Sequence, residues 1–180
     1  MRKRSGIPAM ITVLLAMVVV CRPVAAQLGI MPIHIGAAVG GAFPLSDFGN
    51  AFSTGFNVTG TIAVTPPLIP VGFRGDVVYN HFGSKGASNA TAKIAGASAN
   101  AIFGMPGVII TPYVIGGIGY YHVSSSLTGT TASNHFGFNA GAGLNVPLLV
   151  FKAFVEARYN HISESGGSTS FVPVTVGVMF

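Results

Sequence analysis

Residues 134–146, NHFGFNAGAGLNV, decide the fold of this chain, because two kinds of residue alternate through the whole stretch. One set of alternate positions is apolar and consists of Phe136, Phe138, Ala140, Ala142, Leu144 and Val146. The other set is small or polar and consists of His135, Gly137, Asn139, Gly141, Gly143 and Asn145. A period of two is typical of a β-strand with two different faces. The stretch therefore predicts a strand with one apolar face.

The same alternation recurs along the chain. It is clear in 33–43, 56–64 and 171–180. In about 70–83 and about 150–163, charged side chains occupy the polar face. Two further strands are predicted at about 91–103 and about 110–123, where glycine and alanine leave the facing of the side chains open. The sequence therefore predicts eight strands.

The composition indicates the environment of these strands. Of the 180 residues, 50% are hydrophobic and only 7% are charged, and the mean hydropathy is +0.65. This excludes a disordered chain and argues against a soluble domain or a multidomain enzyme. Residues 94–151 carry no charge, yet Gly, Asn, Ser and Pro interrupt them.

A bilayer accepts only helices and closed barrels, because every backbone polar group must be bonded internally. We therefore expect an all-β, eight-stranded, antiparallel up-and-down transmembrane β-barrel. The alternative is a soluble secreted barrel of the lipocalin kind, whose apolar face would point inward.

The first 26 residues have the features of a cleaved signal peptide. Arg2, Lys3 and Arg4 precede an apolar segment at 7–20, and small residues at 24–26 offer a cleavage site. A retained anchor helix is the alternative. Cleavage would leave residues 27–180 as the barrel domain and lower the net charge from +5 to +1, since only five basic residues and four acids remain. Because most of the basic charge would leave with the leader, it is no evidence for nucleic-acid binding. The single cysteine would leave too, so we expect no disulfides.

The connections between the strands alternate in character. Residues 65–70, 104–109 and 147–149 are short, whereas 44–52, 84–89, 124–133 and 163–169 are polar and longer. Outer-membrane barrels have short periplasmic turns and longer outer loops. Tyr79, Tyr120 and Tyr159 end alternate strands, where an aromatic girdle is expected at the outer membrane interface.

The chain resembles the small eight-stranded outer-membrane β-barrels of the OmpA/OmpX type. The resemblance covers residues 33–180 and rests on residues 40–49 (GGAFPLSDFG), the strand-end aromatics and the last strand. It implies an outer-membrane location, with outer-membrane lipids and lipopolysaccharide as partners and no nucleic acid. It also implies that the last strand is the signal read by the barrel-assembly machinery, through Val174, Val176, Val178 and Phe180. Pro173 is a misfit in that strand, because proline cannot donate to a ladder. A monomer is expected, although the oligomeric state stays open.

Charged residues predicted to face the lumen form the main candidate site. They are Arg74, Asp76, Lys152, Glu156 and Arg158. The strands at 70–83 and 150–163 lie four apart in a ring of eight, so their side chains face each other across a narrow interior. The set is interpreted as a structural ion-pair plug, or alternatively as the lining of a selective pore.

The histidines do not indicate a metal site. His81, His122 and His161 fall on alternate strands, which places them about 10 Å apart at about 4.8 Å per strand. One metal ion with bonds near 2 Å cannot be shared across that gap. We therefore expect no metal and no other cofactor.

The function expected from the sequence is non-enzymatic: a structural or surface-interaction barrel whose lumen is plugged by ion pairs. A narrow solute channel or porin is the alternative. A second alternative is a lipid A-modifying enzyme, since His161 and Ser163 resemble the His-x-Ser pair of lipid A deacylases. That family also needs a carboxylate on the following strand, and no acid follows Glu164 here. No catalytic residue is therefore assigned.

Overall fold

The computed structural model describes residues 32–66, 70–86, 90–105, 109–126, 132–164 and 167–180. The expected signal peptide lies outside the described residues, so its cleavage stays a prediction. Among the described residues, no helix has both the length and the hydropathy needed to cross a membrane.

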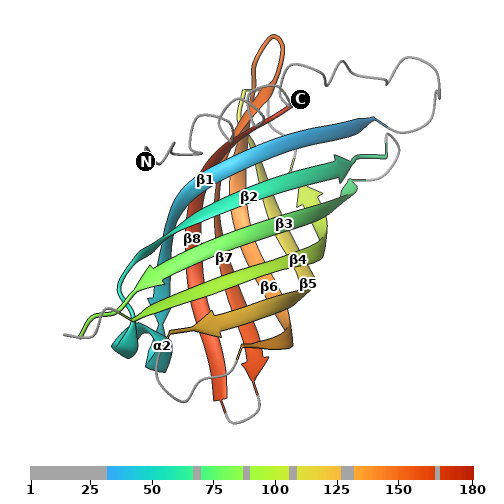
Figure 1. Ribbon diagram of the computed structural model, residues 1–180. Helices are drawn as coiled ribbons and strands as arrows, with labels where there is room; N and C mark the ends of the chain where they lie inside the picture. Colours follow the sequence, from blue (N-terminus) through green and yellow to red (C-terminus); the bar gives the residue numbers. More distant parts are fainter. Residues whose placement is uncertain (1–31, 67–69, 87–89, 106–108, 127–131, 165–166) are drawn as a thin grey trace, which may run out of the picture. The chain divides into compact units, whose positions relative to one another are not determined.

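Eight tilted strands form one closed barrel in chain order (Figure 1). They are β1 (Ile33–Leu45), β2 (Gly55–Val64), β3 (Val71–Gly83), β4 (Thr91–Gly104), β5 (Thr111–Ser125), β6 (Ser133–Pro147), β7 (Lys152–Glu164) and β8 (Gly167–Met179). Every neighbouring pair is antiparallel, and β1 pairs with β8 to close the ring. The predicted antiparallel up-and-down barrel is confirmed.

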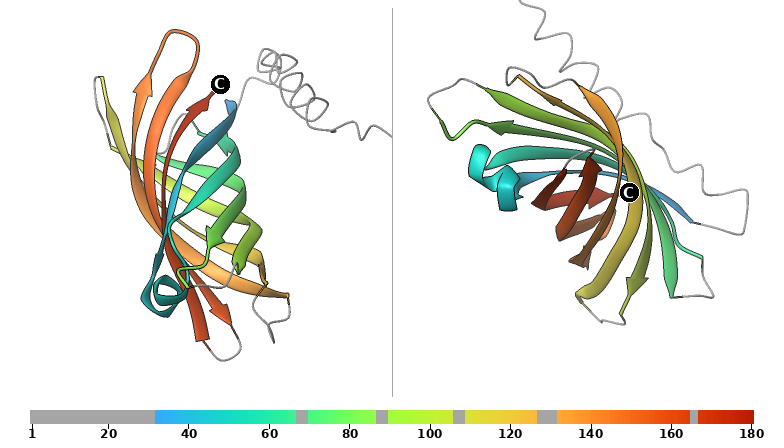
Figure 2. Two further views of the ribbon diagram at one scale, coloured as in Figure 1. Left: turned by 60° about the vertical axis from the view of Figure 1, so that its left-hand side comes forward. Right: turned by 90° about the horizontal axis from the view of Figure 1, so that it is seen from below.

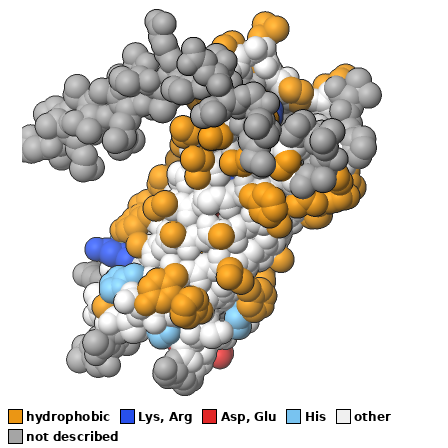
Figure 3. Space-filling view, turned by 90° about the vertical axis from the view of Figure 1, so that its right-hand side faces the viewer, with side chains coloured by type: hydrophobic (Ala, Val, Ile, Leu, Met, Phe, Trp, Pro, Cys, Tyr) orange, Lys and Arg blue, Asp and Glu red, His pale blue; other side chains and the backbone are white. Residues whose placement is uncertain are grey.

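The side chains face as the alternation predicts. In β6, Phe136 and Phe138 are exposed on the outer wall, while Asn139 between Phe138 and Ala140 is buried in the lumen. The structure also gives the facing of the two strands that the sequence left open. In β4, odd-numbered residues face outward; in β5, even-numbered residues do. Hydrophobic side chains are spread over the outer wall in the space-filling view (Figure 3).

The last strand closes the barrel along its full length. Val39 lies opposite Val176, and Ile35 and Phe180 exchange two backbone hydrogen bonds of 3.0 and 2.8 Å. On the other side, the ladder with β7 pairs Ala157 with Val174 and then resumes three residues further along β7, beyond Pro173. The proline therefore interrupts the ladder locally without shifting its register.

The connections differ from the prediction in two places. Residues 44–52 were expected to be a polar loop, but they contain a short helix, α2 (Ser46–Ala51). Residues 163–169 were also expected to be a loop, but β7 continues to Glu164 and β8 begins at Gly167. Strand pairing continues through this hairpin, because Glu164 still lies opposite Gly167.

The helix α2 marks one end of the barrel, and the C-terminus lies at the other (Figures 1 and 2). We call these the α2 end and the C-terminal end. Lys85 anchors the helix, because its Nζ donates to the Gly49 carbonyl at 2.6 Å and its backbone N–H donates to the Ala51 carbonyl at 3.1 Å. These contacts join the connection after β1 to the one after β3.

Candidate functional site

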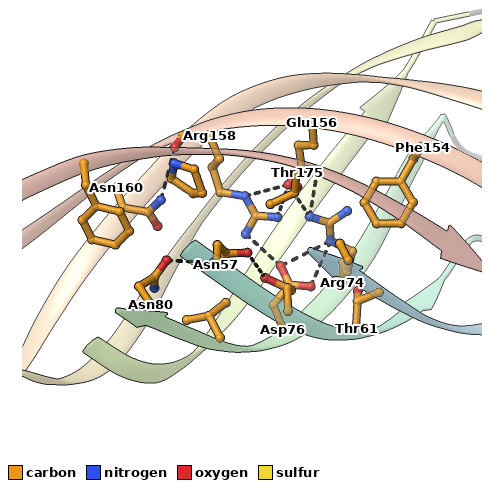
Figure 4. Close-up of a pocket in the computed structure, with 15 residues that line it drawn as sticks. Asn57, Thr61, Arg74, Asp76, Asn80, Phe154, Glu156, Arg158, Asn160 and Thr175 are labelled. Atoms are coloured by element: carbon orange, nitrogen blue, oxygen red, sulfur yellow. Dashed lines mark hydrogen bonds and ion pairs between the residues drawn. The ribbon is translucent and has the colours of Figure 1, made fainter. Parts of the chain in front are cut away.

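Four buried charges meet in the middle of the lumen, and we call them the ion-pair plug: Arg74 and Asp76 of β3 with Glu156 and Arg158 of β7 (Figure 4). Within each strand the two residues are two positions apart, so they share the inward face. Their side chains are 7% exposed or less. The plug holds two positive and two negative groups, so its formal charge is zero.

The plug follows from complementary sequences on two strands that run in the same direction. The order is Arg-x-Asp in β3 and Glu-x-Arg in β7, so each basic residue faces an acid across the lumen. Arg74 Nη2 donates to both Glu156 oxygens at 2.8 and 2.9 Å. Arg158 Nη1 donates to Asp76 Oδ2 at 2.8 Å. Both arginines also contact the acid of their own strand.

Neutral donors also bind the acids. Tyr113 of β5 donates its hydroxyl to Glu156 Oε2 at 2.8 Å. Asn100 of β4 donates to Asp76 Oδ2 at 2.9 Å and accepts from Asn139 Nδ2 at 2.9 Å. The attraction within a buried ion pair repays the cost of desolvation only when the geometry is good and further hydrogen bonds are made. In this network Asp76 Oδ1 makes only an ion pair with Arg74 Nε at 3.1 Å, and Asn139 Oδ1 has no hydrogen-bond partner among the described residues. The plug and its neutral donors therefore join five strands into one polar network.

An apolar layer fills the lumen between the plug and the α2 end. Its members are Ala42, Phe48, Phe52, Phe82, Ala92, Ile94, Tyr121, Ile162 and Phe171. Phe82 is fully buried, and its ring makes edge contacts with Phe48 at 5.0 Å and with Phe171 at 5.6 Å. The helix α2 thus inserts aromatic side chains into one mouth of the barrel. We call this set the α2-end layer.

A smaller apolar layer lies on the opposite side of the plug. It consists of Ala38, Ala63, Phe154 and Met179, and we call it the C-terminal layer. Phe154 carries the Arg74 guanidinium over its ring, with Cζ 5.9 Å from the ring centre. The cavity lined by the plug has a volume of about 20 Å³, roughly the space of one water molecule. The arrangement binds charge internally and leaves little space for a solute.

Lys152 was predicted to belong with these charges, and the structure places it elsewhere. It is the first residue of β7, four positions before Glu156, which is about 13 Å along a strand. Its Nζ lies 3.4 Å from Nε2 of His34 near the C-terminal end. Facing the lumen is therefore not enough to bring Lys152 into contact with the other charges, because residues on one face also differ in their position along the barrel axis.

Sequence reasoning missed the two tyrosines of the lumen. Tyr113 and Tyr121 are 2% and 1% exposed and point inward from β5. The sequence feature that could have revealed them is glycine at neighbouring inward positions, because the tyrosine rings need space there. A Cβ on Gly119 would lie 2.6 Å from the Tyr121 hydroxyl, and one on Gly143 would overlap the Tyr113 ring. Alternation of polar and apolar residues alone does not reveal that an inward tyrosine needs an inward glycine beside it.

The residues of the alternative enzyme hypothesis are not arranged as a catalytic triad. His161 Nδ1 lies 3.0 Å from the hydroxyl of Ser170, its cross-strand partner, and not against Ser163. Glu164 ends β7 on the inward side and binds the Thr169 hydroxyl. No group of three metal-binding side chains occurs among the residues that the structure describes.

The residues expected to form the C-terminal assembly signal share the outer wall. Val174, Val176, Val178 and Phe180 are between 37% and 59% exposed, at every second position. Phe180 packs against Phe151, with ring centres 5.8 Å apart. Their recognition by an assembly machinery stays a prediction.

Comparisons with known proteins agree with this architecture. The family model described as outer membrane protein beta-barrel domain matches residues 12–180. The comparison with curated proteins found no match. Among solved structures, Neisserial surface protein A is 17% identical, with a TM-score of 0.60 over 82% of this chain and 95% of that one.

Two further solved structures are similar to this chain. A major outer membrane protein from Thermus thermophilus is 11% identical, with a TM-score of 0.53 over 83% of this chain and 98% of that one. Ail of Yersinia pestis is 19% identical, with a TM-score of 0.48 over 84% and 99%. At these identities, Neisserial surface protein A and the Thermus thermophilus protein show the fold alone, and the similarity to Ail, with its lower TM-score, carries no argument.

Proposed function

Because the chain belongs to the outer membrane protein β-barrel domain family, we propose that it is a non-enzymatic structural barrel of the outer membrane that makes modest surface contacts through its loops. The α2 end would face the cell exterior and the C-terminal end the periplasm. The exposed apolar outer wall supports insertion in a bilayer, since outer-membrane barrels present such a wall to lipid.

The layered lumen is the observation that carries this proposal. The ion-pair plug lies between two apolar layers, and the cavity beside it is about 20 Å³. An aqueous pore needs a continuous polar path with room for water. Here, Phe48, Phe82 and Phe171 occupy the α2 end of that path. A closed lumen favours a structural role over the narrow solute channel.

The contacts of the plug support a stabilising role as well. Each acid accepts hydrogen bonds from both arginines, and Glu156 also accepts one from Tyr113. Groups that served as selectivity elements would have to exchange these partners for a passing ion. The present network already provides a partner for each charge, so it cross-links opposite walls of the barrel instead.

Two of the connections at the α2 end offer limited surface for a partner. The β7–β8 hairpin has only two residues between its strands, and α2 is held against the barrel by Lys85. We propose that surface contacts are correspondingly small, and that membrane lipids and the barrel-assembly machinery are the main partners. The His161–Ser170 contact lacks a carboxylate among the described residues, which favours a non-enzymatic role.

A liposome-swelling assay tests the proposal. The protein purified from the membrane fraction is reconstituted at the same molar ratio as a general porin, and swelling is followed in small sugars. We expect the porin to cause swelling and this protein to match protein-free liposomes. Swelling that rises with the amount of folded protein would contradict the closed lumen and favour the channel.

A further inference from the structure

Three basic or imidazole side chains gather on the outer wall near the α2 end, on adjacent strands. His81 of β3 lies directly opposite Lys93 of β4. His122 of β5 lies opposite Ala95, so it is the diagonal neighbour of Lys93 on the same face. Such diagonal neighbours are about 7–8 Å apart, within reach of long side chains. We call His81, Lys93 and His122 the rim patch.

The rim patch lies at the edge of the apolar wall. In Figure 3, lysine and histidine side chains lie in the lower half of the face among hydrophobic side chains, and an acidic side chain lies at its lower end. Phe56 stacks on the His81 ring with centres 5.5 Å apart. Tyr120 and Phe136 pack at 4.9 Å on the same wall and are 49% and 72% exposed. Aromatic residues in this position mark the level of lipid headgroups.

No acid faces the rim patch among the described residues. The four acids of the chain are Asp47 on α2, Asp76 and Glu156 in the lumen, and Glu164, which binds Thr169. The helix α2 packs against β1 and β8 and also contacts Lys85 in the connection after β3, but no contact between Asp47 and the rim patch is found among the described residues. The adjoining segments 87–89 and 127–131 contain no charged residue. The charge of Lys93 is therefore not balanced by an acidic side chain on this wall.

We propose that the rim patch is a docking surface for the phosphate group of a lipid headgroup in the outer leaflet. Lys93 supplies a positive charge, and lysine is a common phosphate binder. The His81 imidazole lies beside Lys93 on the neighbouring strand, and the Asn134 amide oxygen accepts the His122 Nδ1–H at 2.8 Å, which fixes the orientation of that ring. A soluble acidic partner fits less well, because the neighbouring wall is apolar and would be covered by lipid.

The inference rests on the orientation proposed above, and native mass spectrometry of the detergent-solubilised protein tests it. The probes are bisphosphorylated lipid A and the same lipid with its phosphates removed. We expect wild-type protein to prefer the phosphorylated lipid, and Lys93→Gln to weaken its binding by about tenfold, the effect of losing one charged hydrogen bond. His122→Asn should weaken it by a smaller factor.

Lys152→Gln is the matched control, because it removes the same charge near the C-terminal end. It should leave binding unchanged. Equal binding of both lipids, or equal losses in Lys93→Gln and Lys152→Gln, would overturn the inference. Heat-dependent gel migration and membrane flotation are measured first on the same samples. A protein that does not float with membranes would refute the proposed function itself, whereas a floating protein without phosphate preference would refute only the docking surface.

Discussion

Glu156 is the residue on which the ion-pair plug depends most. Arg74, Arg158 and Tyr113 all donate to its carboxylate. We predict that Glu156→Ala lowers the free energy of unfolding by about 3–5 kcal/mol, because it leaves buried positive charge without a partner. Urea unfolding of the protein in lipid vesicles measures this, with the folded fraction read from gel migration.

Glu164→Ala is the control for this prediction, since it removes an acid from the end of the same strand. Glu164 binds only the Thr169 hydroxyl among the contacts described, so a loss of about 1 kcal/mol is expected. Equal urea midpoints for Glu156→Ala and the wild type would show that the plug does not stabilise the barrel.

Gly119 gives a second test of lumen packing. A methyl group there would lie 2.6–2.7 Å from the buried Tyr121 ring, whereas one on Gly60 of the outer wall has no atom within 4 Å. We predict that Gly119→Ala destabilises the barrel by about 1–3 kcal/mol through overpacking. The urea midpoint of unfolding of Gly60→Ala should equal or exceed that of the wild type. If both variants behave alike, the Tyr121 ring does not occupy the lumen as described.

The sequence predicts well on which face of a strand a charged residue lies. It predicts poorly how far along the barrel axis that residue lies. Arg74, Asp76, Glu156 and Arg158 meet because a period of two places them inward. Lys152 has the same facing, yet it lies too far along β7 to join them. Height depends on the stagger between strands, and that stagger comes from the pairing registers, which alternation alone does not contain.

The helix α2 is a closing element as well as a connection. Its Phe48 is 9% exposed and contacts the rings of Phe52 and Phe82, while Asn50 on the same helix is exposed. We predict that Phe48→Ala lowers the free energy of unfolding by about 3 kcal/mol, in the range for buried aromatic truncations. Asn50→Ala should change it by less than about 0.5 kcal/mol. Urea titration of both variants measures these changes. Equal losses of unfolding free energy would mean that the aromatic contacts of α2 do not stabilise the barrel.

The elements themselves were predictable to different degrees. The eight strands follow from alternation, and β6 is the clearest case. The helix α2 was missed because it has only six residues and begins at Ser46 with a positive φ of 51°. Its N-cap, Leu45, makes no side-chain capping bond. A helix without these local signals is stabilised by tertiary packing, here by Phe48 and Phe52 in the barrel mouth.

At the scale of the whole molecule, the outer wall must face hydrocarbon. Ala97 lies in the middle of β4 and is exposed on that wall. We predict that Ala97→Arg destabilises the barrel by about 2–4 kcal/mol in lipid vesicles, the cost of a charge at mid-bilayer. Ala97→Leu should be close to neutral. A soluble barrel would tolerate both changes equally, so equal unfolding midpoints in vesicles would contradict the membrane assignment.

The closed topology was predictable because an apolar chain without a spanning helix has few other solutions in a bilayer. The filling of the lumen was predictable only in part. The charges at its centre are apparent in the sequences of β3 and β7, whereas the α2-end layer combines side chains from α2, six strands and the residue after α2. Such a cluster has no local pattern, since its members meet only when the barrel closes.

The proposed function depends on a lumen that is closed to solutes, and single-channel recording in a planar bilayer measures this. The protein is inserted after its fold has been verified by heat-dependent gel migration. We predict a flat current trace at the baseline of the protein-free bilayer, since the ion-pair plug lies between two apolar layers. Discrete, reproducible conductance steps from the folded protein would contradict the account and would make Arg74, Asp76, Glu156 and Arg158 the lining of a pore.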